Sequence, residues 1–197
     1  MSHPSIILAS SSQTRRELMS RLHLDYCCVS PDIDESSQNE THADDLARRL
    51  AFEKAKHVAT QNPQAIVIGS DQVAWLLDSP DQFIGKPLTQ AHAIAQLTEQ
   101  SGKTLCFSTA LSVQHEDTQY QKTAVVHYQV KFRTLTQLEI ERYVQLENPL
   151  QCAGSFKGEG LGITLFESMH GDDFTALMGL PLIQLCHYLR DFNITLP

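Results

Sequence analysis

The segment at residues 65–73 constrains the fold of this chain more than any other. It begins with the apolar run Ala-Ile-Val-Ile, which is typical of a strand buried on both faces of a sheet in an α/β protein. The apolar run stops at Gly69, and Ser70, Asp71 and Gln72 follow it. Open α/β sheets bind ligands beside the ends of such strands, so Asp71 is a candidate functional carboxylate. An aspartate that only caps a turn would give the same local pattern.

Strand-like and helix-like segments alternate through the first half of the chain, and two strand-like segments then precede a helix. This order predicts an α/β fold with a mixed sheet. The length suits one domain, residues 1–197, or one elongated domain with two lobes. We expect a turn at residues 78–81 and a glycine-rich loop at 152–162. The expected strands are 6–9, 26–29, 65–68 with 73–77, 83–87, 103–114 and 122–132, and the expected helices are 17–22, 43–60, 89–99, 136–146 and 182–190.

Composition excludes several classes of protein. The formal net charge of -8 disfavours a general nucleic-acid-binding surface. The longest apolar runs are far shorter than the roughly 20 residues that a membrane-spanning helix needs, and no N-terminal signal pattern is present. The five cysteines are odd in number and lack a C-x-x-C motif or a zinc-ligand spacing, which indicates reduced, mostly buried thiols. We therefore expect a cytoplasmic protein that binds neither nucleic acid nor membrane.

A basic and serine-rich segment, residues 10–16, lies between the first strand and the first helix. Arg15 and Arg16 fall in the first helical turn, where cations oppose the helix dipole. Their position is explained if an anion binds there to free backbone N–H groups, the hydroxyl of Ser10 and an arginine side chain. Solvated arginines are the alternative. The Walker A spacing is absent, so this segment is not a P-loop.

Three further charged residues have ambiguous positions. Lys54 projects from or beside the apolar stripe of the helix at 43–60, so its ammonium either extends to solvent or reaches into a cleft to bind phosphate. Lys86 precedes Pro87, which favours an extended backbone and places the ammonium at a strand end. Glu35 belongs to an acidic stretch after the strand at 26–29, which is either a solvated turn or half of a cation site.

Taken together, the polar residues without an evident structural role fall at the ends of different elements, as cleft residues commonly do. Three cations with two or three carboxylates suit a polyphosphate bound through a divalent metal ion. No Ser-His-Asp or Cys-His arrangement is indicated, and G-x-S-x-G is absent. The residues in this set are Ser10, Arg15, Glu35, Lys54, Asp71, Lys86 and Glu159.

Seven segments, spread over nearly the whole chain, resemble the Maf family of nucleoside triphosphate pyrophosphatases and occur in that family's order. One such motif would be weak support, whereas seven in order are specific. The matching segments are Leu8-Ala9-Ser10-Ser11-Ser12 with Arg15-Arg16, Asp34-Glu35, Glu53-Lys54-Ala55, Gly69-Ser70-Asp71-Gln72, Gly85-Lys86-Pro87, Ala153-Gly154-Ser155-Phe156 and Gly179-Leu180-Pro181-Leu182.

The resemblance implies an inosine-triphosphatase-like fold, with an elongated, curved, mixed sheet flanked by helices around a central cleft. It also implies a homodimer that uses a divalent cation, Mg²⁺ or Mn²⁺, to hydrolyse a nucleoside triphosphate to the monophosphate and pyrophosphate. In this family Asp71 would be the proton acceptor and, with Glu35, a metal ligand. The implied phosphate contacts are Ser10, Arg15, Lys54 and Lys86.

The resemblance further points to a substrate. Thr14, Gln72 and Glu159 stand where family members that act on dTTP and UTP typically have Arg, Thr and Gln, and they resemble the branch that hydrolyses 7-methyl-GTP as a house-cleaning function. Methylation at N7 makes guanine cationic, and the Glu159 carboxylate could pair with it, whereas a glutamine suits a neutral pyrimidine. The alternative role for Glu159 is an ion pair with Lys157. The alternatives are a dTTP/UTP pyrophosphatase and a non-catalytic, nucleotide-binding regulator of cell division.

Overall fold

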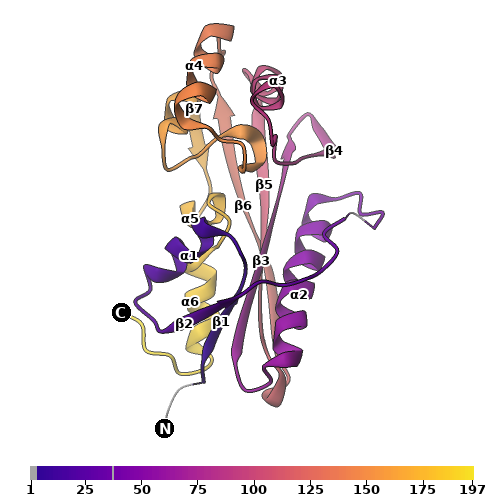
Figure 1. Ribbon diagram of the computed structural model, residues 1–197, viewed down its shortest axis with the longest axis vertical. Coiled ribbons are helices and arrows are strands. Elements are labelled where there is room, and N and C mark those ends of the chain that lie inside the picture. Colours follow the sequence, from indigo (N-terminus) through magenta and orange to yellow (C-terminus); the bar gives the residue numbers. More distant parts are fainter. Residues whose placement is uncertain (1–3, 37) are drawn as a thin grey trace.

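The computed structural model describes residues 4–36 and 38–197 of the chain (Figure 1). Its helices and strands confirm most of the expected segments. In chain order the elements are β1 (Ile6–Ala9), α1 (Gln13–Ser20), β2 (Tyr26–Val29), α2 (Ala43–Gln61), β3 (Ile66–Leu76), β4 (Ser79–Ile84), α3 (Gln90–Gln100), β5 (Thr104–His115), the 3₁₀ turn η1 (Glu116–Thr118), β6 (Tyr120–Phe132), α4 (Gln137–Glu147), η2 (Ala153–Ser155), η3 (Leu161–Leu165), β7 (Phe166–His170), α5 (Phe174–Leu177) and α6 (Leu182–Arg190).

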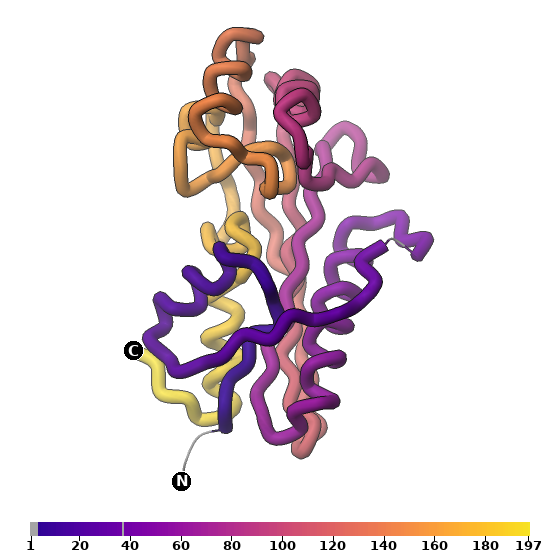
Figure 2. Tube along the Cα trace, in the orientation of Figure 1, coloured from indigo at the N-terminus to yellow at the C-terminus, as the bar shows by residue number. Residues whose placement is uncertain are grey.

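A seven-stranded mixed sheet forms the centre of the fold. Its order is β2-β1-β3-β5-β6-β7, with β4 added to the free edge of β3. β1 is parallel to both β2 and β3, and all other pairs are antiparallel. The predicted α/β class with a mixed sheet is therefore confirmed. The long strands β3, β5 and β6 run almost the full length of the molecule in Figures 1 and 2 and join its two ends.

The two ends of these long strands carry different helices and different cores. We call the end with α1, α2 and α6 the lower lobe and the end with α3, α4 and η2 the upper lobe (Figure 1). The upper core contains aromatic side chains, among them Phe107, Phe132 and Phe156. The lower core beneath α1 and α6 is aliphatic and includes Leu8 and Ile68. The site described below lies between the two lobes.

The edge of β3 has a gap in the middle of the sheet. β1 pairs with β3 only as far as Gly69, and β4 pairs with it only from Ala74 onward. In the described part of the chain, residues 70–73 therefore have β5 as a strand partner on one side and no strand on the other. This gap opens where the parallel strand β1 ends, which is the position where α/β sheets commonly bind ligands.

Gly69 allows α2 to pack closely against β3. A Cβ atom built on Gly69 would lie 2.4 Å from the backbone oxygen of Ala51 and 2.7 Å from the backbone nitrogen of Ala55, both on α2. Any side chain at this position would push the helix away from the strand. Because Lys54 lies between these two helical residues, the close packing also brings its side chain to the gap in β3.

Replacing Gly69 with alanine is therefore expected to lower the free energy of unfolding by about 1–3 kcal/mol, because α2 must move to accommodate the methyl group. Chemical denaturation monitored by circular dichroism measures this change. Gly85→Ala is the matched control, since an added Cβ there meets nothing within 4 Å. Equal denaturation midpoints for the two variants would show that the close contact between α2 and β3 at Gly69 does not contribute to stability.

The structure corrects several expectations. β3 does not break at Gly69 but continues through Asp71 to Leu76, because β5 pairs with it along this length. The expected turn at 78–81 is shorter and lies at residues 77–78, since β4 begins at Ser79, and the strand expected at 83–87 is therefore shifted to Ser79–Ile84. Pro80 is tolerated in β4 because β4 is an edge strand. Two short elements were not expected, β7 and α5. All five cysteines are free, but only Cys106 is buried, so the expectation of mostly buried thiols is wrong.

Candidate active site

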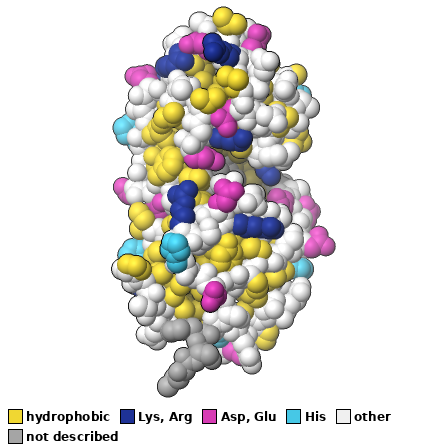
Figure 3. Space-filling model, turned by 60° about the vertical axis from the view of Figure 1, so that its left-hand side comes forward, with side chains coloured by type: hydrophobic (Ala, Val, Ile, Leu, Met, Phe, Trp, Pro, Cys, Tyr) yellow, Lys and Arg dark blue, Asp and Glu magenta, His cyan; other side chains and the backbone are white. Residues whose placement is uncertain are grey.

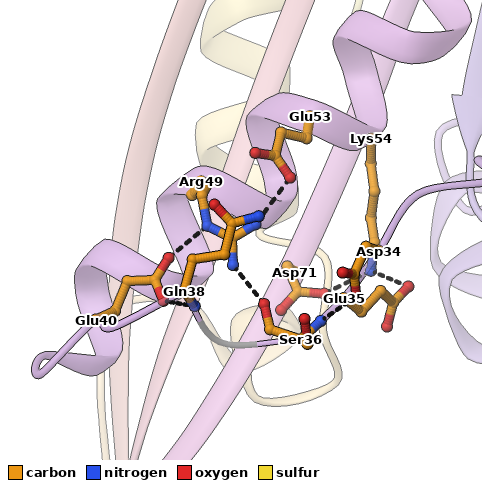
Figure 4. A network of polar contacts seen from close by, with 9 residues as sticks. All are labelled: Asp34, Glu35, Ser36, Gln38, Glu40, Arg49, Glu53, Lys54 and Asp71. Carbon is orange, nitrogen blue, oxygen red and sulfur yellow. Dashed lines mark hydrogen bonds and ion pairs between the residues drawn. The ribbon is translucent and has the colours of Figure 1, made fainter.

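A buried lysine joins two carboxylates at the gap in β3. Lys54 Nζ lies 2.6 Å from Asp71 Oδ1 and 2.8 Å from Glu35 Oε1 (Figure 4). Lys54 is only 4% exposed, so the interpretation that its ammonium extends to solvent is wrong. Asp71 is also buried and lies within a strand, so it does not serve as a turn cap. Each of the three residues comes from a different part of the chain.

Arg49 attaches the loop that carries Glu35 to α2. Its guanidinium donates to the backbone oxygen of Ser36 at 2.8 Å and to Glu53 Oε2 at 2.9 Å, and it also pairs with Glu40 (Figure 4). These contacts tie the backbone beside Glu35 to the helix that bears Lys54. Glu35 itself remains accessible, with 61% of its side chain exposed. Its carboxylate can therefore contact Lys54 and remain accessible to a ligand.

Arg15 and Lys86 add positive charge to the same site. Partial burial alone would raise the pKa of Glu35, but the hydrogen bond and charge of Lys54, with the charges of Lys86 and Arg15, hold that pKa below its ordinary value. Desolvation lowers the pKa of Arg15, and the charges of Asp71 and Glu35 partly oppose this. Glu35 is consequently ionised at neutral pH. Five of the six predicted charged residues thus form one electrostatic cluster, and Glu159 is the exception.

Ser10 lies at the start of the turn that leads into α1. It is buried, and its hydroxyl oxygen accepts a hydrogen bond from the backbone N–H of Ser12 at 3.2 Å. Ser12 in turn caps α1 by accepting from the backbone N–H of Arg15 at 3.4 Å. Ser10 thus shapes the N-terminus of α1, next to the arginine that enters the site.

A cleft adjoins this charged cluster and contains the three residues that were predicted to select the base. Thr14, Gln72 and Glu159 all line it, together with Arg15 and Lys86, which connect it to the charged cluster. Figure 3 shows basic and acidic side chains gathered around the waist between the two lobes. The other lining residues are Ser12, Phe107, Gln151, Cys152, Ala153, Phe156, Lys157, Gly158, Leu177, Met178 and Gly179.

The cleft has a volume of about 180 Å³, which is smaller than a cavity of about 650 Å³ that lies between β2 and the C-terminal segment. The larger cavity is lined by no predicted site residue and is mainly apolar. The smaller cleft is lined by five of the predicted site residues, Thr14, Arg15, Gln72, Lys86 and Glu159, whereas Ser10, Glu35, Lys54 and Asp71 lie outside its lining. Size alone therefore does not identify the site.

Gln72 has a structural role that the sequence did not reveal. Its amide nitrogen donates to the backbone oxygens of Ala176 and Leu177 at 2.8 and 3.1 Å, and it lies 2.9 Å from Thr109 Oγ1. The amide N–H groups of Gln72 thus bind α5 to the sheet. Only its carbonyl oxygen remains to accept a hydrogen bond from a ligand.

Gly179 is a second residue whose contribution was missed. Its backbone oxygen accepts a hydrogen bond from Arg15 Nε at 2.8 Å and lies 2.9 Å from Ser70 Oγ. Its φ of +96° is a backbone conformation that favours glycine. The Gly-Leu-Pro-Leu segment was recognised as a family motif, but its function in orienting Arg15 became visible only in the structure.

Glu159 has no ion pair or hydrogen bond from its side chain within the described residues, and it is exposed at the cleft. Lys157, the neighbour that was considered as its partner, instead contacts Glu147: its Nζ lies 3.2 Å from Glu147 Oε1 and 2.9 Å from the Glu147 backbone oxygen. The interpretation of Glu159 as a simple partner of Lys157 is therefore wrong. Its carboxylate is available to a ligand.

The described residues include no group of three or more His, Cys, Asp or Glu side chains arranged to hold a metal ion. Glu35 and Asp71 nevertheless converge on the same lysine ammonium. Magnesium commonly binds proteins through one or two carboxylates and completes its coordination with substrate phosphates and water. The two carboxylates fit an ion that arrives with a nucleotide rather than one held by protein ligands alone.

The described part of the chain contains no helix that is long and apolar enough to cross a membrane.

Comparisons with known proteins agree with this geometry. A protein named nucleoside triphosphate pyrophosphatase from Acinetobacter baylyi is 69% identical over 192 residues, covering 98% of this chain and 97% of that protein. A 7-methyl-GTP pyrophosphatase from Pseudomonas savastanoi pv. phaseolicola is 48% identical over 194 residues, covering 98% of this chain and all (100%) of that protein.

The chain also resembles a solved structure and matches a family model. The HAM1 protein from Coxiella burnetii superposes with a TM-score of 0.52 at 14% identity, covering 95% of this chain and 99% of that one, which confirms the inosine-triphosphatase-like fold. The family model described as Maf-like protein matches residues 5–192. Because this match spans nearly the whole chain and the two relatives match over 97% and 100% of their own length, the chain belongs to the family of Maf-like proteins.

Proposed function

We propose that this protein is a nucleoside triphosphate pyrophosphatase that hydrolyses 7-methyl-GTP to the monophosphate and pyrophosphate. The observation that carries the proposal is the convergence of Arg15, Lys54 and Lys86 on the carboxylates of Glu35 and Asp71. Concentrated positive charge on an acidic protein favours a polyanionic substrate. The names of the two relatives support the same chemistry.

The charged residues have complementary roles in this reaction. Asp71 accepts the proton of the water that attacks a phosphorus at the linkage between the α- and β-phosphates. Arg15, Lys54 and Lys86 neutralise the phosphate oxygens and the pyrophosphate leaving group, because charge stabilisation is the main contribution a protein makes to phosphoryl transfer. The N-terminus of α1, with Ser10, supplies further hydrogen-bond donors for an anion.

We also propose that a divalent cation, Mg²⁺ or Mn²⁺, takes part with the substrate. Glu35 and Asp71 would hold it, and when bound it would neutralise phosphate charge and polarise a phosphoryl oxygen. The support is the donor chemistry: two carboxylates, one of them largely exposed, lie beside the cations that would bind phosphate. Lys54 balances the charge of these carboxylates.

The preference for a methylated guanine depends on Glu159. A carboxylate without a protein partner, at the edge of a small cleft, can pair with a cationic base and accept its N–H groups. Thr14 and the carbonyl oxygen of Gln72 line the same cleft and would complete base recognition. The resemblance to the Maf family also supports a cytoplasmic homodimer.

A nucleotide panel tests the substrate. Pyrophosphate release should be fastest with 7-methyl-GTP, slower with GTP, dTTP and UTP, and absent with a chelator of divalent cations. Glu159→Gln should reduce the ratio of kcat/KM for 7-methyl-GTP over GTP by about tenfold, the value of one charge-assisted hydrogen bond. A preference for dTTP or UTP would instead make the protein a pyrimidine nucleotide pyrophosphatase. Binding without turnover would favour a regulator.

A further inference from the structure

The loop that carries Glu159 is held in a tight conformation. The backbone oxygen of Lys157 accepts hydrogen bonds from the backbone N–H groups of Gly160 and Gly162 at 3.3 and 3.1 Å. A Cβ atom on Gly162 would lie 2.2 Å from the same oxygen, so this position requires glycine. Residues 157–162 therefore form a compact turn with Glu159 at its exposed side.

Helix α4 attaches this turn at both ends. The hydroxyl oxygen of Tyr143 accepts from the backbone N–H of Lys157 at 3.0 Å, and Glu147 Oε2 accepts from the backbone N–H of Leu161 at 2.8 Å. Glu147 also contacts the Lys157 ammonium through its Oε1 and through its backbone oxygen. Its side chain is 16% exposed, so these contacts are partly shielded from water. The Glu147 carboxylate thus holds the Leu161 end of the turn and the Lys157 side chain, and Tyr143 holds the backbone at the other end.

The contact with Glu147 determines where the Lys157 charge lies. Lys157 is two residues from Glu159, and its side chain lines the same cleft. Burial raises the pKa of the Cys152 thiol, another lining group; the charge of Lys157 lowers this pKa, and the charges of Glu159 and Glu147 raise it. If Lys157 lost its contact with Glu147, the carboxylate nearest to it in the sequence would be that of Glu159.

We propose that Glu147 is a positioning residue for base selection: it holds the Lys157 ammonium away from Glu159 and so keeps the Glu159 carboxylate unpaired for a cationic base. This proposal rests on the proposed function, because it assumes that Glu159 reads the base. Glu147 itself lies outside the lining of the cleft. It would affect specificity indirectly, by preventing an ion pair between Lys157 and Glu159.

Removing the negative charge of Glu147 should weaken its hold on the Lys157 ammonium, because only the backbone oxygen of residue 147 and a neutral amide then remain as acceptors. The ammonium can then pair with Glu159 and compete with the substrate. Binding of a cationic base should weaken more than binding of a neutral base. The ratio of kcat/KM for 7-methyl-GTP over GTP should fall by about tenfold in Glu147→Gln, mainly through a higher KM for 7-methyl-GTP, because the lost interaction is made in the ground state as well.

The decisive experiment compares four proteins with both nucleotides: wild type, Glu147→Gln, the double variant Glu147→Gln with Lys157→Met, and Glu141→Gln. Glu141 is an exposed glutamate of the same helix that contacts only Gln137 among the described side chains, so its substitution should leave the ratio unchanged. The double variant should recover the wild-type ratio, since no released ammonium remains. General loosening of the turn would not be corrected by removing Lys157.

The outcomes separate the two proposals. A wild-type protein without preference for 7-methyl-GTP overturns the proposed function. A wild-type preference that survives in Glu147→Gln, or one that is lost but not recovered in the double variant, overturns the role of Glu147. If Glu147→Gln is too unstable to assay, Gly160→Ala is a second variant: its Cβ would lie 2.8 Å from Glu147 Oε2 and 3.0 Å from Oε1, so the carboxylate must move relative to Lys157. The ratio should then fall and recover when Lys157→Met is added, and an unchanged ratio would overturn the role of Glu147.

Discussion

Asp71→Asn is expected to lower the rate of pyrophosphate release by about 10²–10⁴-fold, because an amide cannot accept the proton of the attacking water. The substitution preserves the size of the side chain, and its carbonyl oxygen can still accept the hydrogen bond from Lys54. The fold should therefore remain intact, with an unfolding midpoint close to that of the wild type. Steady-state assays of pyrophosphate release, together with circular dichroism, measure both quantities.

Asp78→Asn is the matched control for this variant. Asp78 lies at the turn between β3 and β4, with 58% of its side chain exposed, and its contact with Lys103 is long at 3.6 Å. Its substitution should change neither rate nor stability. If Asp71→Asn kept near-native activity, the assignment of the proton acceptor would be wrong, whatever the behaviour of the control.

Lys54→Met is expected to reduce both activity and stability. It leaves the buried Asp71 carboxylate without its ammonium partner, and breaking such a buried pair typically lowers the free energy of unfolding by about 3 kcal/mol. For a chain of this size, the melting temperature should fall by roughly 6–12 °C. Differential scanning calorimetry at neutral pH checks the expected change.

Lys56→Met, on the same helix, is the control for this loss. Lys56 pairs with Glu116 at the surface, with 47% of its side chain exposed. An exposed pair of this kind contributes at most about 1 kcal/mol, so the melting temperature should change little. Similar stabilities for the two variants would mean that Lys54 does not compensate the charge of the two carboxylates.

Hydrophobic patterns in the sequence were sufficient to predict most of the fold. The apolar run before Gly69, the stripe of α2 and the Thr136–Glu139 capping box each depend on local spacing, and all three elements are present. β7 and α5 were missed because they are short. The continuous course of β3 depends on pairing with β5, which local sequence does not encode.

The candidate site was predicted in its residues but not in its contacts. Motifs placed Arg15, Lys54 and Asp71 in one group, and the structure brings them together. No local pattern could indicate that Gln72 donates to α5, or that Lys157 selects Glu147 as its partner. Gln72 and α5 are far apart in the chain, and Lys157 has two carboxylates, Glu147 and Glu159, close to it in sequence. Which contacts form therefore depends on the tertiary structure.

We propose above all that the charged cluster around Asp71 hydrolyses a nucleoside triphosphate between its α- and β-phosphates. Phosphorus NMR of a reaction with 7-methyl-GTP and magnesium tests it most directly, because it identifies the products. The wild type should form pyrophosphate and the nucleoside monophosphate in equal amounts, and Asp71→Asn should form neither at a comparable rate. Release of inorganic phosphate with a nucleoside diphosphate, or equal product formation by both proteins, would contradict the claim.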